Sequence, residues 1–305
     1  MDRRIFLKDV AMWSAGVAAA APIFTIDRTA LAAETGAPVV AVIKGKDYAA
    51  MVARVLEPLG GMAAFVKKGM KVVVKPNIGF DRTVAQAANT HPDIVKATVK
   101  LVLDAGAASV AVFDNPTGDE RLCYASSGIQ EAVNSLKDPR VTCAYVDKRL
   151  FVPVEIKNGK SLKKFDFYKT ALEADCYINL PVAKHHGSAK ITVGLKNIMG
   201  ILGGNRGQIH WSLGQRIADC NTVVRSRLTI VDASRVMFRN GPSGGAIEDL
   251  KVMDTIVASP DIVAVDAYSA RAFFGMEPKD VDAIRAAAEL GLGQMDLAKI
   301  KVIKV

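Results

Sequence analysis

Short runs of β-branched residues alternate along this chain with segments in which apolar residues recur at helical spacing. The runs predict strands over residues 39–44, 71–75, 109–113, 141–146, 176–182, 227–231, 254–258 and 299–304. The intervening segments predict helices over residues 47–57, 91–104, 129–136, 213–224, 262–274 and 278–290. Strands that alternate with helices form a mostly parallel sheet covered by helices on both faces, so the sequence predicts an α/β fold.

Local turn and cap signals refine this pattern at two places. Over residues 151–169, two apolar and aromatic runs flank the turn sequence Lys157-Asn158-Gly159-Lys160, which predicts an inserted β-hairpin. The second predicted helix has a clear start, with Thr90 as its expected N-cap and Pro92 in its first turn.

The first 32 residues read as an export signal rather than as part of the fold. The pair Arg3-Arg4 is close to the twin-arginine signature, an uncharged run follows over residues 10–26, and an A-x-A sequence at 30–32 offers a cleavage site. An uncleaved anchor is the alternative, although the run is short for a membrane span. We therefore expect the twin-arginine export machinery to deliver the protein to the periplasm. Residues 33–305 are expected to form a single α/β domain, with no stable membrane span after cleavage.

The charge balance favours anionic partners. The first 32 residues hold four of the 40 Lys and Arg residues and three of the 31 Asp and Glu residues, which leaves the remainder with a net charge of +8. A basic surface attracts anionic ligands or an anionic membrane face. No block of Lys and Arg with interleaved aromatic residues is present, so we expect no nucleic-acid partner.

Polar side chains follow several of the predicted strands. Lys75 and Asn77 close one strand, Asp114 follows the next, residues 184–186 follow another, and Asp232 follows a fourth. Ligands of α/β sheets bind outside the carboxyl ends of the strands, so we expect these side chains to meet at one crevice. His91 begins the helix after the strand over 71–75, and we expect it to face the same crevice.

The stretch over residues 184–210 combines histidines, cations and glycines. It holds three of the four histidines, His185, His186 and His210, beside six glycines. Glycine lets the backbone turn or approach a ligand closely, and imidazole can ligate a metal or carry a proton. An exposed or capping role is the alternative for each histidine. His185 in particular alternates with His186 along an extended chain, so the two side chains are expected to point to opposite sides.

These residues divide among three expected roles. Proton transfer at carbon is expected of His91, His186 and His210, because one base can remove a proton that another returns. Metal ligation is the other use of imidazole and carboxylate, and its candidates are His185, His186, His210, Asp114 and Asp232. Binding of a cofactor or of an anionic ligand is expected of Lys75, Asn77, Lys184, Lys196, Asn197 and Arg206.

The four cysteines show no ligand spacing. Cys123, Cys143, Cys176 and Cys220 form no C-x-x-C pair, and buried thiols are the expected state of those in strand-like runs. An iron–sulfur cluster would require all four to converge in the fold, and a disulfide is the further alternative in an oxidising compartment.

Several motifs together resemble a known family. They are VVVKPNIG (72–79), THPDIVKATVKLVLDAGA (90–107), VAVFDNP (110–116), INLPVAKHH (178–186), GLKNIMGILGG (194–204), TIVDAS (229–234) and SPDIVAVD (259–266). The chain resembles domain-of-unknown-function family 362, whose members often carry export signals or ferredoxin modules. This chain has no added cysteine-rich segment, so the resemblance implies no ferredoxin function of its own.

A more distant similarity is to the catalytic domain of nickel-pincer lactate racemase. The resemblance lies in the order of His91, His186, Lys196 and His210 along the chain. It implies a transition metal or a nickel-pincer-like nucleotide as cofactor, with Lys196 holding it.

Together these observations predict an exported, cofactor- or metal-dependent enzyme. It would act on a small anionic organic substrate by proton or hydride transfer at carbon, as a racemase, an epimerase or an oxidoreductase. The alternative is a non-catalytic carrier of a metal or cofactor that serves a redox partner, including an iron–sulfur protein.

Overall fold

The computed structural model describes residues 36–305. The export signal expected over residues 1–32 lies outside the described residues. Within the described part of the chain, no helix combines the length and the apolar character that crossing a membrane requires.

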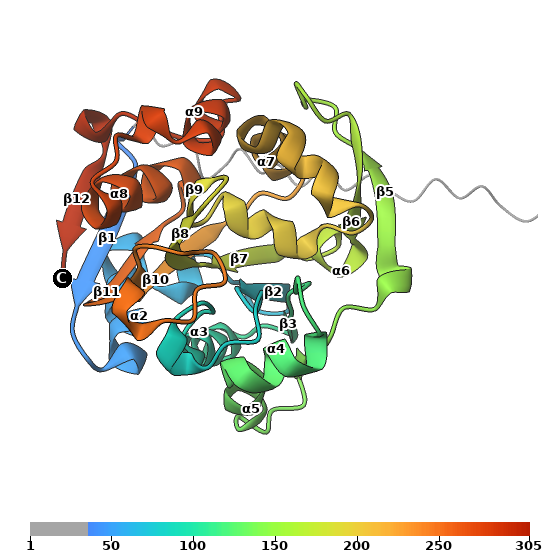
Figure 1. The fold of residues 1–305 in the computed structure, drawn as a ribbon. Helices are drawn as coiled ribbons and strands as arrows, with labels where there is room; N and C mark the ends of the chain where they lie inside the picture. The colour runs from blue at the N-terminus through green and yellow to red at the C-terminus, as the bar shows by residue number, and fades with distance from the viewer. Residues whose placement is uncertain (1–35) are drawn as a thin grey trace, which may run out of the picture. The chain divides into compact units, whose positions relative to one another are not determined.

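A ten-stranded mixed sheet forms the centre of residues 37–305 (Figure 1). Eight strands lie side by side in the order β12 (Lys301–Lys304), β1 (Val39–Lys44), β11 (Leu250–Ser259), β10 (Leu228–Met237), β7 (Cys176–Leu180), β2 (Lys71–Pro76), β3 (Ser109–Val112) and β4 (Val141–Cys143). The strands from β10 to β4 pair in parallel, whereas β11 is antiparallel to both of its neighbours. Two further strands, β8 (Val182–His186) and β9 (Lys190–Thr192), extend the sheet beside β10.

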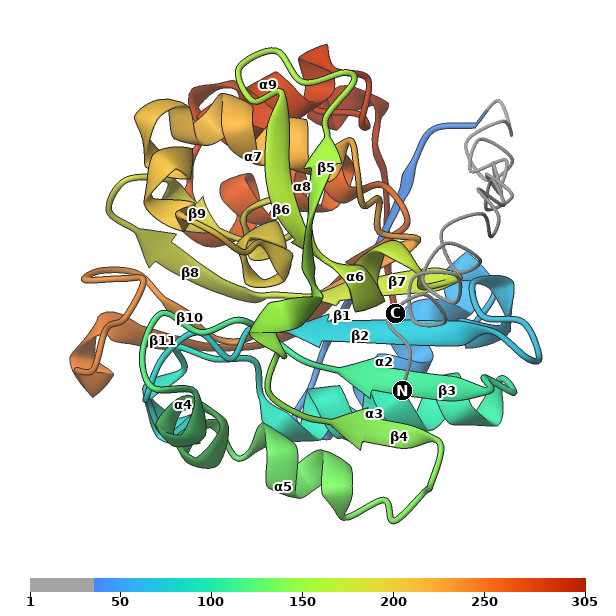
Figure 2. The same cartoon turned by 90° about the vertical axis from the view of Figure 1, so that its right-hand side faces the viewer.

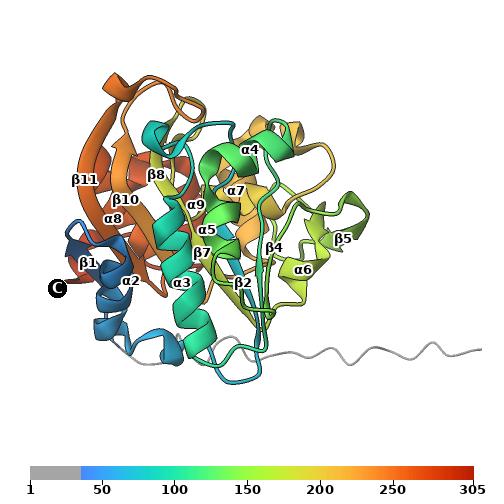
Figure 3. The same cartoon turned by 90° about the horizontal axis from the view of Figure 1, so that it is seen from below.

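Helices cover both faces of this sheet, which confirms the predicted α/β class. Figure 2 shows one layer above it, formed by α7 (Leu213–Asn221), α8 (Ile262–Phe274) and α9 (Asp282–Glu289). The opposite layer, seen in front of the strands in Figure 3, contains α2 (Tyr48–Leu56), α3 (Pro92–Asp104), α4 (Glu120–Ser127) and α5 (Ile129–Asn134).

Each face of the sheet has its own apolar core. Along β2, Val72 and Val74 pack into one core and Val73 into the other. Successive side chains of a strand point to opposite faces, so a strand buried on both faces must be apolar at every position. This requirement explains why the strands appear in the sequence as continuous β-branched runs.

The inserted hairpin is present as predicted. Strands β5 (Phe151–Glu155) and β6 (Lys164–Tyr168) pair antiparallel in a separate two-stranded sheet, followed by the short helix α6 (Lys169–Leu172). Phe167 of β6 also bridges to Leu202. The hairpin therefore packs against the glycine-containing stretch that follows β9.

The structure corrects the expected start of α3. His91, not Thr90, is the N-cap, and its Nδ1 accepts a hydrogen bond from the backbone N–H of Asp93 at 3.2 Å. The Thr90 hydroxyl instead donates to the carbonyl of Leu180 at 2.8 Å and accepts from the N–H of Asn77 at 2.9 Å. Thr90 thus ties the loop after β2 to the end of β7, a long-range bond that the local sequence does not reveal.

A change of strand partner at Pro181 shapes the centre of the sheet. Strand β7 pairs with β2 as far as the pair Leu180–Pro76. Beyond Pro181 the chain continues as β8, which pairs with β10 and β9 instead of β2. The carboxyl end of β2 is therefore not covered by a neighbouring strand on this side, and polar side chains gather there.

Candidate functional site

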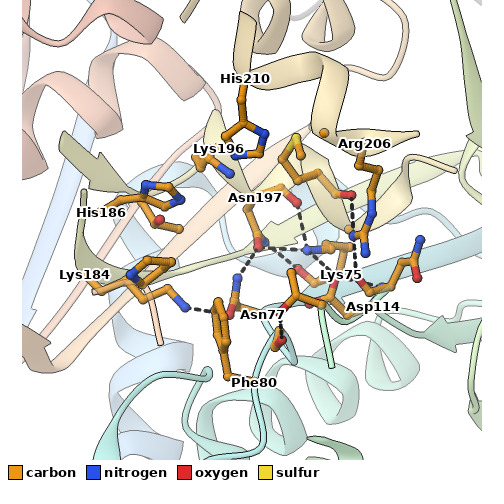
Figure 4. Close-up of a pocket in the computed structure, with 18 residues that line it drawn as sticks. Lys75, Asn77, Phe80, Asp114, Lys184, His186, Lys196, Asn197, Arg206 and His210 are labelled. Atoms are coloured by element: carbon orange, nitrogen blue, oxygen red, sulfur yellow. Dashed lines mark hydrogen bonds and ion pairs between the residues drawn. The ribbon is translucent and has the colours of Figure 1, made fainter. Parts of the chain in front are cut away.

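A cavity of about 430 Å³ lies at the carboxyl end of β2 (Figure 4). Strands β2 and β8, the loops after β2 and β3, and two 3₁₀ helices, η5 (Lys196–Ile201) and η6 (Arg206–Ser212), contribute its walls. It brings together nine of the residues singled out in the sequence: Lys75, Asn77, Asp114, Lys184, His186, Lys196, Asn197, Arg206 and His210. The strand-end expectation thus holds for most of the candidates.

A buried ion pair forms the floor of this cavity. Lys75 Nζ lies 2.8 Å from Asp114 Oδ1, and the two side chains are 1% and 3% exposed. The Lys75 ammonium also donates to the carbonyl and to Oδ1 of Asn197, both at 2.8 Å. Asp114 accepts from the N–H groups of Ile78 at 2.6 Å and Asn115 at 3.0 Å. Burial lowers the pKa of Lys75, and the Asp114 charge acts against that shift.

Asn197 connects strands β2 and β7 and the loop after β2 through its side-chain amide. Its Nδ2 donates to the carbonyl of Lys75 and to Asn179 Oδ1, and its Oδ1 accepts from Asn77 Nδ2 at 3.1 Å. Asn179 Nδ2 donates in turn to the carbonyl of Gly194 at 2.9 Å. A buried amide network in which donors and acceptors are paired fixes one arrangement of the segments that carry it.

Two glycines permit the close packing of this segment. Gly194 and Leu195 donate their N–H groups to the Asp266 carboxylate of α8, at 2.8 and 2.9 Å. A Cβ on Gly194 would lie 2.7 Å from Asp266 Oδ1, and one on Gly200 would collide with Asp114 Oδ1 and with the end of Lys75. The sequence G-L-K-N-x-x-G is therefore a packing requirement around the ion pair and Asp266.

Lys184 is a second buried cation. Its Nζ donates to Asn77 Oδ1 at 3.0 Å and to the carbonyl of Ala88, and lies 4.6 Å from the centre of the Phe80 ring. Burial lowers its pKa to about 7, with further lowering by the charges of Lys196 and Lys75. Phe80 was not singled out in the sequence, although it follows directly on the K-P-N-I-G run.

Lys196 differs from these two lysines in its contacts. Its ammonium makes no hydrogen bond or ion pair with any residue between 36 and 305, and Figure 4 shows it pointing into the cavity beside His210. Burial lowers its pKa to about 8, assisted by the positive charges of Lys75 and Arg206. Arg206 donates to the carbonyls of Asn115 at 2.7 Å and Pro116 at 2.6 Å, and burial lowers its pKa as well.

His186 is held as a neutral imidazole. Its Nδ1 accepts from the N–H groups of Ser188 at 3.3 Å and Ala189 at 3.2 Å, which leaves the ring proton on Nε2. Burial lowers its pKa to about 3, with further lowering by the Lys196 and Lys184 charges. His186 therefore offers a hydrogen-bond donor rather than a free lone pair. His210 lies on η6 and is exposed, so its ring can exchange protons with water.

Comparison with known proteins identifies the family of this chain. The model of the family described as Domain of unknown function (DUF362) matches residues 72–271. The chain belongs to this family. All nine residues gathered in the cavity lie inside the matched range.

One curated relative and two solved structures are similar to this DUF362 chain. The thylakoid-associated protein sll1697 of Synechocystis sp. (strain ATCC 27184 / PCC 6803 / Kazusa) is 28% identical over 253 residues, which cover 78% of this chain and 73% of that protein. A crystal structure of a Thermotoga maritima protein is 12% identical, with a TM-score of 0.43, over 81% of this chain and 60% of that one. The lactate racemase apoprotein of Thermoanaerobacterium thermosaccharolyticum is 14% identical, with a TM-score of 0.39, over 68% and 54%. At these scores we base no argument on the two structures.

Three candidates lie outside the cavity. His91 lines a different hollow with Tyr48, whose ring meets its own edge to face at 4.8 Å. Its backbone N–H donates to Asp232 Oδ2 at 2.7 Å, which holds the start of α3 near β10 and turns the ring away from the cavity. Asp232 also accepts from Ser234, and His185 Nδ1 accepts from the N–H of Gly241 at 3.2 Å.

The donors in the cavity do not fit a metal ion. A metal-bound imidazole donates its second ring N–H to an acceptor, whereas both backbone partners of His186 Nδ1 are donors. Between residues 36 and 305, no three His, Cys, Asp or Glu side chains form a group suited to a metal. We therefore derive no chemical step through a nickel-pincer nucleotide or a metal.

The four cysteines do not converge. Cys220 of α7 packs in one core, whereas Cys123, Cys143 and Cys176 lie in the core on the other face of the sheet. All four are buried and free, and burial raises the pKa of Cys143 and Cys176 to about 12. The iron–sulfur alternative, which needs the four thiolates at one point, is wrong for this chain.

The cavity also contains residues that the sequence did not indicate. Pro242 lines it from the glycine-rich loop over residues 241–245, and Asn115, Thr117, Thr192 and Met199 also form part of the wall. The loop has no strand–helix context of a nucleotide-binding motif, so sequence alone gave no reason to place it here. Only the folded structure shows that Pro242 lines the same cavity as η5.

Proposed function

We propose that this protein is an enzyme that binds a small organic acid in the cavity and moves a proton at the carbon next to its carbonyl group. The observation that carries the proposal is the excess of cations over carboxylates in the cavity. Asp114 is the only carboxylate that lines the cavity among the described residues, and Lys75 already neutralises it. The three remaining cations, Lys184, Lys196 and Arg206, form no ion pair within residues 36–305.

An anionic ligand would relieve this imbalance. Cations that are buried close together raise one another's free energy, and a carboxylate between them turns repulsion into attraction. Burial is the main cause of the lowered pKa values of Lys184 and Lys196, and the neighbouring positive charges lower them further. Binding of a carboxylate is therefore expected to raise both pKa values and to take up protons.

Two imidazoles provide the proton chemistry. The Nε2–H of His186 is suited to donate to the oxygen of an enolate, where negative charge develops when a neighbouring carbon loses its proton. His210, exposed on η6 at the edge of the cavity, is suited to remove that proton and to exchange it with water. This division of roles supports isomerisation, racemisation or epimerisation, each of which ends with a proton returned to carbon.

The test is proton exchange at carbon. The protein is incubated in D₂O with a panel of small 2-oxo and 2-hydroxy acids, and loss of the carbon-bound proton is followed by NMR. We expect exchange with at least one acid, slowed about 10²–10⁴-fold in His210→Gln. His185→Gln is the matched control, because that imidazole lies outside the cavity, and it should exchange at the wild-type rate. Tight binding of an acid without exchange would contradict the proposed catalysis and leave the cavity as a non-catalytic binding site.

We also propose that the chain is exported by the twin-arginine machinery to the periplasm. The support is the order of Arg pair, uncharged run and A-x-A sequence at the start of the chain. The relative from Synechocystis is named as thylakoid-associated, which is compatible with a location outside the cytoplasm for proteins of this kind.

A further inference from the structure

The three lysines of the cavity differ in what their amines contact. Lys75 is held by Asp114 and Asn197, and Lys184 is held by Asn77, the carbonyl of Ala88 and the ring of Phe80. Lys196 alone has no acceptor for its amine among residues 36–305, although it points into the same cavity. An amine with no hydrogen-bonded partner is free to react with a ligand.

The surroundings of Lys196 also make its neutral form accessible. The charged and titratable groups around the cavity are Lys75, Lys184, Arg206, His186, His210 and Asp114. Only one of them is an acid, and it is paired with Lys75. Burial and the neighbouring positive charges lower the pKa of Lys196 to about 8, so about half of these amines are neutral near that pH. Desolvation beside other cations is a known way to activate a lysine as a nucleophile.

We propose that Lys196 is the nucleophile that forms an imine with the carbonyl carbon of a small 2-oxo acid. This inference rests on the proposed function and names the substrate class and the residue that binds it covalently. The acid's carboxylate is attracted by Lys184 or Arg206, which lie on opposite sides of the cavity in Figure 4 and keep N–H groups that no described residue accepts.

The step balances without any further reactant. The lone pair of the neutral Lys196 nitrogen attacks the carbonyl carbon, and the electron pair of the C=O π bond moves to oxygen, which takes up a proton. The carbinolamine then loses its hydroxyl as water, and a protonated imine remains. His210, which lies beside Lys196 in Figure 4, is placed to move the protons between nitrogen and oxygen.

In the imine, the Lys196 nitrogen would take the place of the enolate oxygen in the proton chemistry proposed above, and His210 would still remove the proton. A protonated imine accepts electrons from the adjacent C–H bond more readily than a ketone does, because its nitrogen already carries a positive charge. Removal of a proton from carbon 3 then gives a neutral enamine, and its return completes an exchange. The covalent bond also fixes the acid in one orientation with respect to His210.

Reductive trapping tests this inference. The protein is incubated with pyruvate or 2-oxoglutarate and sodium cyanoborohydride, which reduces an imine to a stable secondary amine. Mass spectrometry of the intact protein and of its peptides then locates the adduct. We expect one adduct per chain, on the peptide that contains Lys196, with a yield that rises with pH through about 8.

Two variants complete the test. Lys196→Arg keeps the positive charge but cannot supply a neutral amine, so the adduct should be lost. Lys190→Arg is the matched control, because Lys190 lies exposed on β9 with its amine on the carbonyl of Asp280, and its adduct yield should equal that of the wild type. If Lys196→Arg fails to fold, peptide mapping of the wild-type adduct still identifies which lysine is modified.

Absence of an adduct at Lys196, or an adduct at another lysine, overturns the inference. Calorimetric binding of the same acids and deuterium exchange at carbon 3 are measured in parallel, without the reductant. If the acids bind and exchange but form no adduct at Lys196, the result contradicts the imine and agrees with the proposed function. If no acid of the panel binds and none exchanges, the result contradicts both the imine and the proposed function.

Discussion

At the scale of single residues, the cavity depends on charges that are satisfied and charges that are not. The Lys75–Asp114 pair is buried and surrounded by hydrogen bonds from Asn197, Ile78 and Asn115. Lys196 lies in the same space without such partners among residues 36–305. A buried charge with a partner has a structural role, whereas a buried charge without one is suited to bind a ligand of opposite charge. The sequence singled out both lysines, Lys75 at a strand end and Lys196 in the glycine-rich stretch, but could not distinguish these two states.

The role of Asp114 can be tested by removing its charge. Asp114→Asn leaves Lys75 buried with no carboxylate, and breaking a buried pair in this way costs about 3–5 kcal/mol. We expect a loss of that order in the free energy of unfolding, measured by urea denaturation at pH 7. Asp104→Asn is the matched control, because its partner Lys100 is also a lysine but both side chains are more than half exposed. The control should change stability by less than about 1 kcal/mol, and equal losses in both variants would contradict the framework role.

At the scale of elements, the alternation of strands and helices could be predicted, whereas the segments that build the cavity could not. The strands are buried on both faces, so their apolar runs stand out in the sequence. Helix α4 was missed because its short polar sequence has little periodicity, and β8 and β9 were missed because their pairing depends on the change of partner after Pro181. The 3₁₀ helices η5 and η6 follow glycines whose conformation is set by bonds to distant residues.

The misplacement of His91 has a related physical reason. The strand-end rule places residues at one edge of a sheet, but it does not say toward which neighbour each side chain turns. Here the bond from the His91 N–H to Asp232, together with the Tyr48 ring, directs the imidazole to a second hollow. The direction of the His91 ring therefore depends on a contact between residues 141 positions apart in the sequence.

The packing of η5 gives a prediction at this scale. A Cβ at Gly200 would collide with Asp114 and the end of Lys75, so Gly200→Ala must displace the ion pair or the helix. We expect a loss of about 1–3 kcal/mol of stability and weaker binding of small carboxylates. Gly187→Ala lies in the same stretch, where an added Cβ meets nothing within 4 Å, and should leave both quantities unchanged. Urea unfolding measures stability and calorimetry measures carboxylate binding. Unchanged stability and binding in Gly200→Ala would show that the cavity tolerates rearrangement.

At the scale of the whole molecule, fold class and location rest on different kinds of information. The α/β class follows from many apolar positions, each of which contributes a little, so errors at single elements do not change it. The proposed export rests on a few residues at the start of the chain, with the Arg pair as its centre. A change at those few positions is therefore a sharp test of location that leaves residues 36–305 untouched.

Export should fail when the Arg pair is replaced by lysines. Lysine keeps the positive charge but lacks the planar, five-donor guanidinium, so a receptor that reads guanidinium geometry will discriminate between them. We expect Arg3→Lys combined with Arg4→Lys to retain the protein in the cytoplasm of a bacterium that has the twin-arginine machinery, while the wild type is found in the periplasmic fraction. Arg28→Lys lies outside the pair and is the matched control, which should be exported normally. Because the cavity lies wholly within residues 72–271, the retained protein should still bind small carboxylates, which separates a defect in targeting from a defect in folding. Equal export of the pair variant and the control would contradict the twin-arginine proposal and leave the chemistry of the cavity unaffected.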